Sequence, residues 1–520
     1  MSSEVSTSPE LVIALAGPVG TPMDTIEESL ANALTAVGYE TVFIKITKAM
    51  ETIPTSVVPS GDSFYDRMCY KMDYGNALCR ANKDPAFLAR LAVFEIRSAR
   101  RAFTGSETRP RERAAYVVRQ LKRPAEVELL RAIYGEQFVL VSAYGPANER
   151  FQILSRMLRK SLNTRAKNSD ITLKANELME RDEDEDTDQY GQKLRETFHR
   201  GDVFIDGIDR SGTDANLTRF VQALFGRCDI SPTKAEYGMY AAKSASLRSA
   251  DLSRQVGAAI FSSSGDIITQ SCNEVPRAFG GNYWDSESPD FRDVKIGFDP
   301  NETETNEILR DIFQRLSDAG PLKEALKKLG PPDQIVKLLT KKPSDDDDLG
   351  GPLLKASVRD LTEYGRVVHA EMGALCDAAR TGKSVLGATL FCTTFPCHNC
   401  TKHLIAAGIT RVVYIEPYPK SKAKMLHKDE IEIENDVPTK VSFVPFVGIS
   451  PIRYKSIFEK SRRKNPDGSA KRWLKDRPLP MLHVHYSAGY IRLEAMGLET
   501  LAGSFSANPS SPSKSPESSA

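Results

Sequence analysis

Three potential metal ligands and one carboxylate stand out in the second half of this 520-residue chain. His369 precedes Glu371 by two positions, and the motif Pro396-Cys397-His-Asn-Cys400 follows further along. Imidazole and thiolate are preferred zinc ligands, and a zinc ion with three protein ligands keeps its fourth position open for water. We therefore predict one catalytic Zn²⁺ per chain, bound by His369, Cys397 and Cys400, with Glu371 beside it.

The chemistry expected of such a site is hydrolysis. Zinc lowers the pKa of a bound water from 15.7 to about 7. In zinc deaminases, which carry His-x-Glu followed by Pro-Cys-x-x-Cys, the hydroxide attacks C4 of a cytosine while the glutamate transfers protons. We expect Glu371 to take the proton of the water and to deliver it to ring N3 and then to the departing amine. The products are a uracil and ammonia.

Other interpretations of the two cysteines need further ligands. A structural zinc knuckle requires a second Cys or His pair, and the remaining histidines offer no obvious one. Six further cysteines occur singly among apolar neighbours, which predicts buried thiols rather than disulfide partners. They are Cys69, Cys79, Cys228, Cys272, Cys376 and Cys392.

The segments around the ligands have the pattern needed to bring them together. We expect helices to alternate with strands, over 369–381 (helix), 387–393 (strand), 397–407 (helix) and 411–415 (strand). Pro396 suits the first position of its helix, which would place the two cysteines one turn apart. The positive end of a helix dipole also favours thiolate.

Before this region the chain predicts a strand pair and a long insertion. A strand from Arg254 to Phe261 and a returning strand from Ile267 to Cys272 are joined by a Ser- and Gly-rich turn, and Asn273 leaves the second strand. We assign a deaminase domain to 235–460, with an insertion at 277–360. The last two segments are a basic loop with a C-terminal extension, 461–505, and a disordered tail, 506–520.

The N-terminal part, 11–230, predicts an α/β domain with a parallel sheet after a disordered start at 1–10. Leu11–Ala16 is a short apolar run typical of a buried parallel strand. The loop Gly17-Pro18-Val19-Gly20-Thr21 follows, then a helix with a predicted Asp24–Glu27 capping box, then a strand at 41–46. This βαβ arrangement places the loop where a phosphate could bind at a helix N-terminus. It lacks the lysine of a P-loop, so a purely structural turn is the alternative.

Composition and charge narrow the class of protein. The chain is 40% hydrophobic and 27% charged, which is typical of globular domains, and its length favours two of them. A formal charge of +1 favours a small substrate over a nucleic acid. No apolar run approaches the ~20 residues of a membrane span, and the first residues do not resemble a signal peptide. We therefore expect a cytoplasmic protein that does not contact a membrane.

Several of these motifs together resemble deoxycytidylate deaminases. The resemblance rests on the segment from Ser246 to Ala258, on Asn273-Glu-Val-Pro276, on His369-Ala370-Glu371 and on Phe395-Pro-Cys-His-Asn-Cys400. It implies a cytidine deaminase-like α/β/α domain with a mixed five-stranded sheet, and assembly into a homo-oligomer. It also implies that Asn273 contacts the sugar or base, that Ala370 contacts the pyrimidine, and that Arg254 lies near the substrate phosphate.

The order of the two domains resembles bacterial anti-phage dCTP deaminases, in which a P-loop nucleotide kinase-like domain precedes the deaminase. The resemblance implies a hydrolase that converts dCTP or dCMP to dUTP or dUMP and depletes the dCTP pool during infection. The first domain would then act as a regulatory nucleotide sensor, and related systems imply an inhibitory RNA as a further partner.

Four other functions remain open on the sequence. One is a housekeeping dCMP deaminase that supplies dUMP for thymidylate synthesis. Another is a tRNA or single-stranded DNA cytosine deaminase that uses the basic segment 461–477. The third is a nucleotide sensor with a vestigial deaminase, and the fourth is a bifunctional enzyme whose first domain phosphorylates nucleotides.

Overall fold

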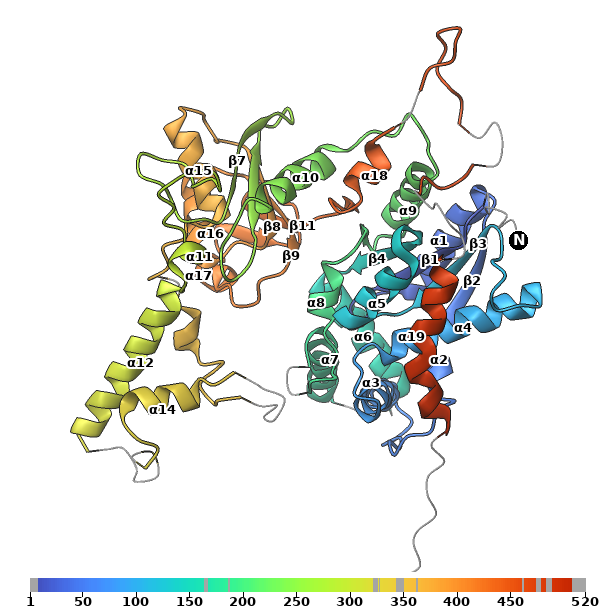
Figure 1. Ribbon diagram of the computed structural model, residues 1–520, viewed down its shortest axis with the longest axis horizontal. Coiled ribbons are helices and arrows are strands. Elements are labelled where there is room, and N and C mark those ends of the chain that lie inside the picture. The colour runs from blue at the N-terminus through green and yellow to red at the C-terminus, as the bar shows by residue number, and fades with distance from the viewer. Residues whose placement is uncertain are drawn as a thin grey trace, which may run out of the picture. The chain divides into compact units, whose positions relative to one another are not determined.

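The computed structural model describes residues 8–162, 167–185, 188–320, 326, 328–342, 350–361, 363–460, 463–473, 478–482 and 489–506. The chain divides into two compact units. The first comprises Met1–Pro232 and Val447–Ala520, and the second comprises Thr233–Phe446. Each unit is built around one sheet, shown with its helices in Figure 1.

The sheet of the first unit has six strands among the described residues, in the order β12-β5-β4-β1-β3-β2. Neighbouring strands are parallel except for β12, which runs antiparallel to β5. The expected parallel sheet is therefore confirmed for five strands, and β12 makes the sheet mixed. The strands are β1 (Leu11–Ala16), β2 (Glu40–Lys45), β3 (Ala114–Arg119), β4 (Phe138–Tyr144), β5 (Val203–Asp206) and β12 (Gly448–Ile449).

One central strand was not expected from the sequence. β3 lies between β1 and β2, so these two strands do not pair directly as the simplest βαβ unit would have them. The strand order reverses at β1, because β3 and β2 lie on one side of it and β4 and β5 on the other. In open α/β sheets such a switch point opens a crevice at the carboxyl ends of the strands. The loop Gly17–Thr21 leaves β1 at this point.

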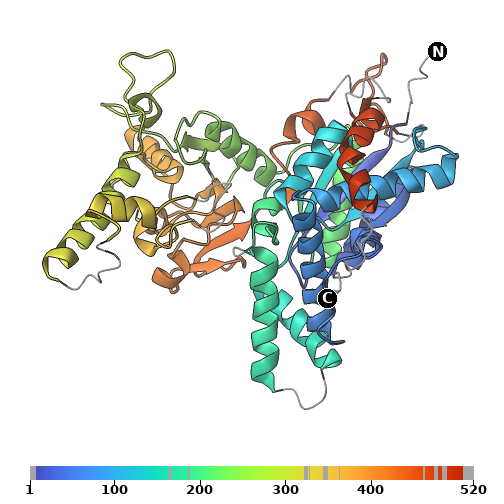
Figure 2. The same cartoon turned by 60° about the horizontal axis from the view of Figure 1, so that its bottom comes forward.

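Helices cover both faces of the first sheet, as Figures 1 and 2 show. Side chains of β1 alternate between two cores: Leu11, Ile13 and Leu15 pack in one, and Val12, Ala14 and Ala16 in the other. The helices are α1 (Met23–Ala36), α2 (Ile46–Met50), α3 (Phe64–Ala81), α4 (Phe87–Thr104), α5 (Pro124–Tyr134), the 3-10 helix η1 (Gly135–Gln137), α6 (Ala147–Ser161), α7 (Asn168–Glu183), α8 (Leu194–Phe198), α9 (Arg210–Leu224), α18 (Tyr454–Phe458) and α19 (Gly489–Ser506).

The start of α1 differs from the expected capping box. Its N-cap is Pro22, which offers no side-chain hydrogen bond. Asp24 and Glu27 instead form ion pairs with Arg119 at the end of β3. The capping-box prediction was wrong, because α1 begins at Met23 and Asp24 therefore lies inside its first turn rather than at the N-cap.

The C-terminal segment belongs to the first unit rather than ending the second. β12 extends the first sheet, and Nε of Arg453 lies 3.1 Å from the Asp202 carboxylate. The sequence-based boundary at residue 460 is therefore wrong, and the second unit ends at Phe446. The expected extension, 461–505, contains α19, which packs against α4 and α5.

The two predicted disordered ends are only partly within the described chain. Residues 1–7 and 507–520 lie outside the described residues. Glu10, in the predicted N-terminal tail, is buried and hydrogen-bonded to Arg100 and Tyr490. The ordered part of the first unit therefore begins before β1.

The second sheet also has six strands among the described residues, in the order β10-β11-β9-β8-β6-β7. β6 runs antiparallel to β7 and β8, and the other pairs are parallel. The expected five-stranded sheet gains β10, a three-residue strand that the sequence did not predict. The strands are β6 (Gly257–Phe261), β7 (Ile267–Cys272), β8 (Thr389–Thr394), β9 (Arg411–Glu416), β10 (Ile431–Ile433) and β11 (Val441–Pro445).

Helices of the second unit include the two that carry the predicted ligands. The core helices are α10 (Lys234–Ser246), α15 (Ala370–Arg380), α16 (His398–Ala406) and α17 (Ala423–Leu426). Those of the insertion are α11 (Asp293–Ile296), α12 (Pro300–Asp318), α14 (Pro332–Leu339) and the 3-10 helix η2 (Ser357–Asp360). The predicted helix–strand alternation from 369 to 415 is confirmed to within two residues at each boundary.

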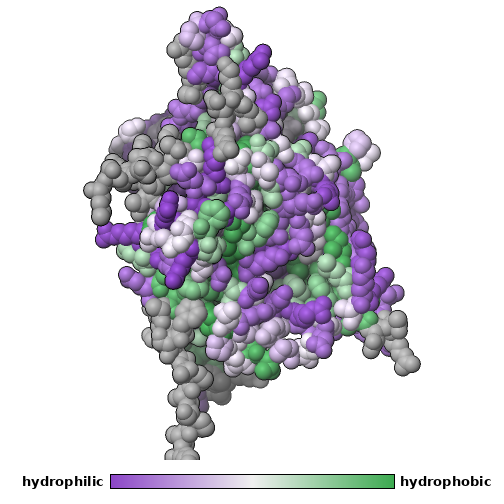
Figure 3. Space-filling view, turned by 90° about the vertical axis from the view of Figure 1, so that its right-hand side faces the viewer, coloured by the Kyte–Doolittle hydropathy of each residue, from purple (hydrophilic) through white to green (hydrophobic). Residues whose placement is uncertain are grey.

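On the surface, hydrophilic residues cover most of the face seen in Figure 3, with hydrophobic residues in patches between them. Within the described part of the chain, no helix combines the length and the apolar character needed to cross a lipid bilayer. The cytoplasmic location stays a prediction.

Candidate metal centre

His369 lies at the N-cap of α15, where two local features hold it. The preceding residue, Val368, forms a backbone bridge with Glu274 just after β7, with N···O distances of 3.0 and 3.2 Å. On α15, Gly373 faces Ser271 so closely that a Cβ would lie 2.4 Å from the Ser271 hydroxyl oxygen. The absence of a side chain at 373 thus allows the helix to approach β7, which places the imidazole at the end of the sheet.

Cys397 and Cys400 lie at the start of α16. Cys397 is the N-cap, and its sulfur accepts a hydrogen bond of 3.4 Å from the backbone N–H of Cys400. The Thr401 hydroxyl donates to the carbonyl of Cys397 at 2.9 Å. Pro396 therefore precedes the N-cap rather than occupying the first helical position as predicted. The outcome for the sulfurs is the one expected, because both cysteines lie within the first turn.

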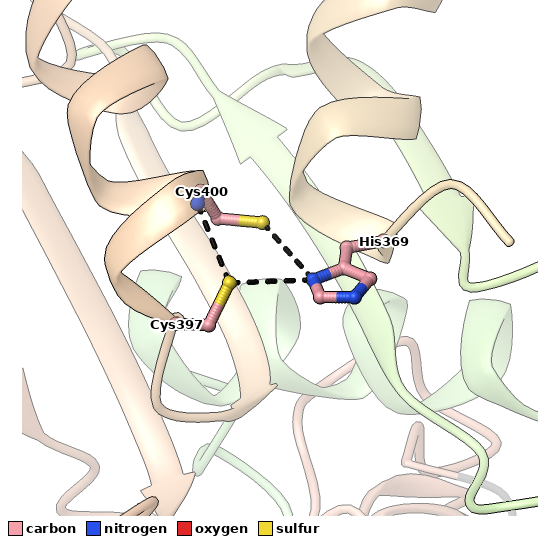
Figure 4. Close-up of side chains that lie close together, drawn as sticks. All are labelled: His369, Cys397 and Cys400. Atoms are coloured by element: carbon pink, nitrogen blue, oxygen red, sulfur yellow. Dashed lines mark hydrogen bonds between the residues drawn. The ribbon is translucent and has the colours of Figure 1, made fainter. Parts of the chain in front are cut away.

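The three predicted ligands converge on one point, as Figure 4 shows. Nδ1 of His369 lies 3.4 Å from the sulfur of Cys397 and 3.4 Å from that of Cys400. Tetrahedral zinc, with Zn–S near 2.3 Å and Zn–N near 2.0–2.1 Å, requires N···S separations of about 3.6 Å. The donor types and their spacing therefore fit zinc. All the ligand atoms lie within 4.8 Å of one another.

Charge within the centre also favours a cation. A hydrogen bond from Cys400, together with one from the His369 imidazole, lowers the pKa of Cys397 to about 4. The Cys397 sulfur in turn raises the pKa of His369 to about 9. Donation to Cys397, followed by burial, raises the pKa of Cys400. Thiolate and imidazole bind a metal only in their deprotonated forms, so a divalent cation at this point would compete with protons for His369, Cys397 and Cys400.

Glu371, the second residue of α15, is only 4% exposed. Burial raises the pKa of its carboxyl group, and the nearby Cys397 adds to the rise. Glu371 is not part of the ligand cluster found among the described residues, and its role in proton transfer stays a prediction. A raised pKa suits a group that must both accept and donate a proton near neutral pH.

Asn273, just after β7, lies beside the segment that leads into β6 and contains Arg254. The Asn273 amide accepts from the N–H of Val256 at 2.7 Å and donates to the carbonyl of Arg254 at 2.8 Å. Nη1 of Arg254 lies 3.1 Å from the Glu416 carboxylate, and the guanidinium lies 5.8 Å from the ring centre of Tyr418. Asn273 therefore orients the backbone that carries Arg254. Contacts of either side chain with a substrate stay predictions.

Ala370 is fully buried in the hydrophobic core of the second unit. It is the first residue of α15, and its contact with a pyrimidine is implied by the family resemblance. That contact stays a prediction.

A cavity of about 280 Å³ in the second unit reveals residues that the sequence did not suggest. Its lining combines a residue before β6 with residues of the insertion, the residue that follows it and the loop after β9: Ser253, Asp299, Asn301, Glu302, Thr305, Lys342, Arg359, Asp360, Leu361, Tyr418 and Lys420. β8 and β9 are parallel neighbours, so the loops that follow them share one edge of the sheet. The position of Tyr418 and Lys420 directly after β9 is the signal that could have identified them.

The predicted phosphate loop, Gly17–Thr21, lies in the first unit between β1 and α1. Gly20 has φ +92°, and a Cβ there would lie 3.0 Å from the carbonyl oxygen of Arg150. Glycine is therefore required at position 20 by both backbone conformation and space. Nucleotide binding by the loop stays a prediction.

Removal of one thiolate provides a direct test of the metal centre. We expect Cys400→Ser to lower the zinc content of purified protein from about one ion per chain to below about 0.1, since two protein ligands do not hold Zn²⁺ tightly. The measurement is metal analysis after dialysis. Cys376→Ser is the matched control, because Cys376 lies exposed on α15 and makes no part of the ligand cluster. Full zinc in Cys400→Ser would exclude this ligand set.

Comparisons with known proteins find similarity in the part of the chain that contains the candidate metal ligands. The family model "Cytidine and deoxycytidylate deaminase zinc-binding region" matches residues 232–416. The deoxycytidylate deaminase of Enterobacteria phage T4 is 42% identical over 76 residues, which are 14% of this chain and 39% of the phage protein. That of phage T2 is 46% identical over 55 residues, which are 11% of this chain and 29% of its own length.

The chain thus spans well under half the length of these curated relatives. Among solved structures, the dCMP deaminase of cyanophage S-TIM5 is similar over 42% of this chain and 99% of its own, with 18% identity and a TM-score of 0.21. The sequence matches place a deoxycytidylate deaminase-type domain within residues 232–416.

Proposed function

Because the chain carries a deoxycytidylate deaminase-type domain, we propose that it is a zinc-dependent hydrolase that deaminates deoxycytidine nucleotides. The observation that carries the proposal is the convergence of His369, Cys397 and Cys400 beside the buried Glu371 within the matched region. The four residues supply the metal ligands and the proton carrier that zinc deaminases use.

The protein groups divide the reaction between them. Zinc, when bound, supplies the Lewis acid that lowers the pKa of water. Glu371 accepts one proton from the water and delivers it to N3 of the cytosine. It then takes the second proton from the new hydroxyl group at C4 and delivers it to the departing amine. Its burial excludes bulk water, which would otherwise exchange with the transferred proton. The hydroxide adds at C4, the C4–N bond breaks, and ammonia leaves a uracil nucleotide.

The cavity beside Tyr418 supports a nucleotide with phosphates as the substrate. Lys342, Arg359 and Lys420 are cationic members of its lining. Asp360 is the partner of Lys420 at 2.6 Å, and Glu302 is the partner of Arg359 at 3.1 Å. The lining also holds the carboxylates of Asp299, Glu302 and Asp360, so a phosphate must compete with them for these cations. The presence of more than one such cation supports dCTP, whereas the names of the relatives favour dCMP.

Substrate choice is tested with the purified full-length chain. dCMP, dCTP, CTP and cytidine are incubated in turn, and ammonia and uracil products are measured. Turnover of a deoxycytidine nucleotide with little turnover of cytidine supports the proposal. Absence of all turnover in zinc-loaded protein would exclude it. Turnover of dCMP without dCTP would favour a housekeeping dCMP deaminase over an enzyme that depletes dCTP.

Removal of the positive charge of Lys420 tests whether the cavity binds the substrate. We expect Lys420→Ala to raise the KM for the preferred nucleotide about tenfold with a smaller change in kcat, because hydrogen bonds to charged groups contribute about 1.5–3 kcal/mol. Lys422→Ala, an exposed lysine two residues away, is the control. An unchanged KM for Lys420→Ala would remove the cavity from substrate binding.

The biological role proposed here is depletion of the dCTP pool as an anti-phage defence. The first unit, with its switch-point loop Gly17–Thr21, would bind a regulatory nucleotide that controls the deaminase. The test is to measure dCTP in infected cells that express the protein or its Glu371→Gln variant. An equal pool in both would exclude deamination as the basis of any protection.

A further inference from the structure

The Gly17–Thr21 loop binds a negatively charged group of the protein itself, the carboxylate of Asp182. The backbone N–H of Val19 donates a hydrogen bond of 2.7 Å to the carboxylate of Asp182, which lies 163 residues away on α7. Asp182 is 1% exposed. A carboxylate thus occupies the position at the start of α1 where loops of this kind bind phosphate.

A lysine completes the anion site. Nζ of Lys122, from the segment after β3, lies 2.7 Å from one carboxylate oxygen of Asp182 and donates to the other at 2.9 Å. The same ammonium donates to the carbonyl of Gly17 at 2.9 Å. The loop sequence lacks the lysine of a P-loop, and Lys122, about 100 residues further along the chain, places a positive charge at the same loop.

Two further groups surround the loop. The Arg150 guanidinium binds the carboxylate of Glu183 at 2.9 Å and approaches the carbonyl of Val19 at 3.5 Å. The hydroxyl of Thr21 has no hydrogen-bond partner although the residue is only 9% exposed. A buried hydroxyl without a partner is costly unless a ligand satisfies it. It lies at the switch point of the sheet, where ligands of α/β proteins bind.

We infer that Asp182 occupies the phosphate position of a binding site for a nucleoside di- or triphosphate. Lys122, the N–H groups of the loop and the Thr21 hydroxyl form this site, and a nucleotide must displace Asp182 to bind. The inference rests on the proposed nucleotide binding by the first unit and names the residue that competes with it. A purely structural Lys122–Asp182 ion pair makes the opposite prediction, because its loss would loosen the loop and weaken binding.

The test measures binding of ATP and of tripolyphosphate to the full-length chain by titration calorimetry. Tripolyphosphate separates phosphate recognition from base recognition. Asp182→Asn keeps the size of the side chain and removes its charge, and we expect it to tighten binding of both probes about 10- to 100-fold. Lys122→Met should weaken binding by a similar factor. Glu177→Gln is the matched control, since it makes the same charge change at an exposed site on α7.

The outcomes separate this inference from the nucleotide-binding proposal. Binding to Asp182→Asn that is tighter than to the unmodified protein supports the inference, including the case in which only the variant binds. Equal or weaker binding in Asp182→Asn overturns it and leaves nucleotide binding intact. Absence of binding in both overturns both.

A measurement on the unmodified chain covers the case in which Asp182→Asn does not fold. With saturating ATP, amide hydrogen exchange should slow in residues 17–21, because their backbone N–H groups donate hydrogen bonds to phosphate oxygens. It should become faster in the last turn of α7, because Asp182 loses its partners there. Unchanged exchange in α7 at saturation, with protection of the loop, would contradict displacement.

Discussion

Glu371→Gln is expected to lower kcat/KM for the deoxycytidine nucleotide by a factor of about 10²–10⁴, the usual contribution of a general acid–base. Glutamine keeps the volume and hydrogen-bonding capacity of the buried side chain but cannot accept and return a proton. The measurement is steady-state kinetics of ammonia release together with zinc analysis. We expect the zinc content to stay near one per chain, because Glu371 is not in the ligand cluster.

The control for this variant is Asp377→Asn, which makes the same carboxylate-to-amide change two turns along the same helix. Asp377 forms an ion pair of 2.7 Å with Arg380 and makes no part of the ligand cluster. Its activity should stay within about twofold of the unmodified protein, since surface ion pairs contribute little. A Glu371→Gln variant that retains zinc and more than about a tenth of the activity would show that another group transfers the proton.

Arg100→Met is expected to destabilise the first unit by about 3–5 kcal/mol, the range found when one partner of a buried ion pair is removed. The Arg100 side chain is fully buried between the carboxylates of Glu10, at 2.8 Å, and Glu494, at 2.7 Å. Methionine fills similar space but leaves both carboxylates without their cation. Because Glu494 lies on α19, the effect should include loosening of this C-terminal helix.

The two units can unfold separately, so the measurement needs a probe confined to the first. The chain has two tryptophans. Trp473 donates a hydrogen bond to the carbonyl of Phe225 in the first unit, and Trp284 lies in the second. Urea denaturation followed by fluorescence in a Trp284→Phe background therefore reports on the first unit. Arg101→Met, at an exposed site on the same helix, should change its stability by less than about 1 kcal/mol.

The loss in Arg100→Met should shrink at low pH. Burial raises the pKa of Glu494 above 4.5, while its bonds with Arg100 act in the opposite direction and disappear in the variant. A carboxyl with a raised pKa binds more protons in the folded state, so stability increases as pH falls through that pKa. We expect the difference in unfolding free energy between the variant and the unmodified protein to decrease as pH is lowered from 7 towards 4.5. A constant difference would mean that lost packing, rather than charge, is responsible.

The candidate ligands and Glu371 could be identified from the sequence because the spacing within each pair of residues is local. His369 and Glu371 are two residues apart at one helix start, and Cys397 and Cys400 lie in the first turn of another. Covalent spacing and helical geometry fix the distance within each pair, and the packing of α15 against β7 helps to bring the two pairs together. The strands and helices that carry them were predicted for the same reason, since short apolar runs and capping positions depend on neighbours in the chain.

Tertiary structure decided the features that depend on distant pairing. Three features could not be predicted because the sequence of a segment does not show which other segment it will pack against. They are the position of β3 between β1 and β2, the addition of β10, and the packing of the segment after residue 447 in the first unit. The same holds for the charges brought to the Gly17–Thr21 loop. The local sequence predicts that a segment is a strand or that a side chain is charged. It does not predict which distant segment will pair with it, because that depends on how the whole sheet is buried. The candidate metal ligands were therefore predictable from local spacing, whereas the ion pair of Lys122 and Asp182 became visible only in the folded chain.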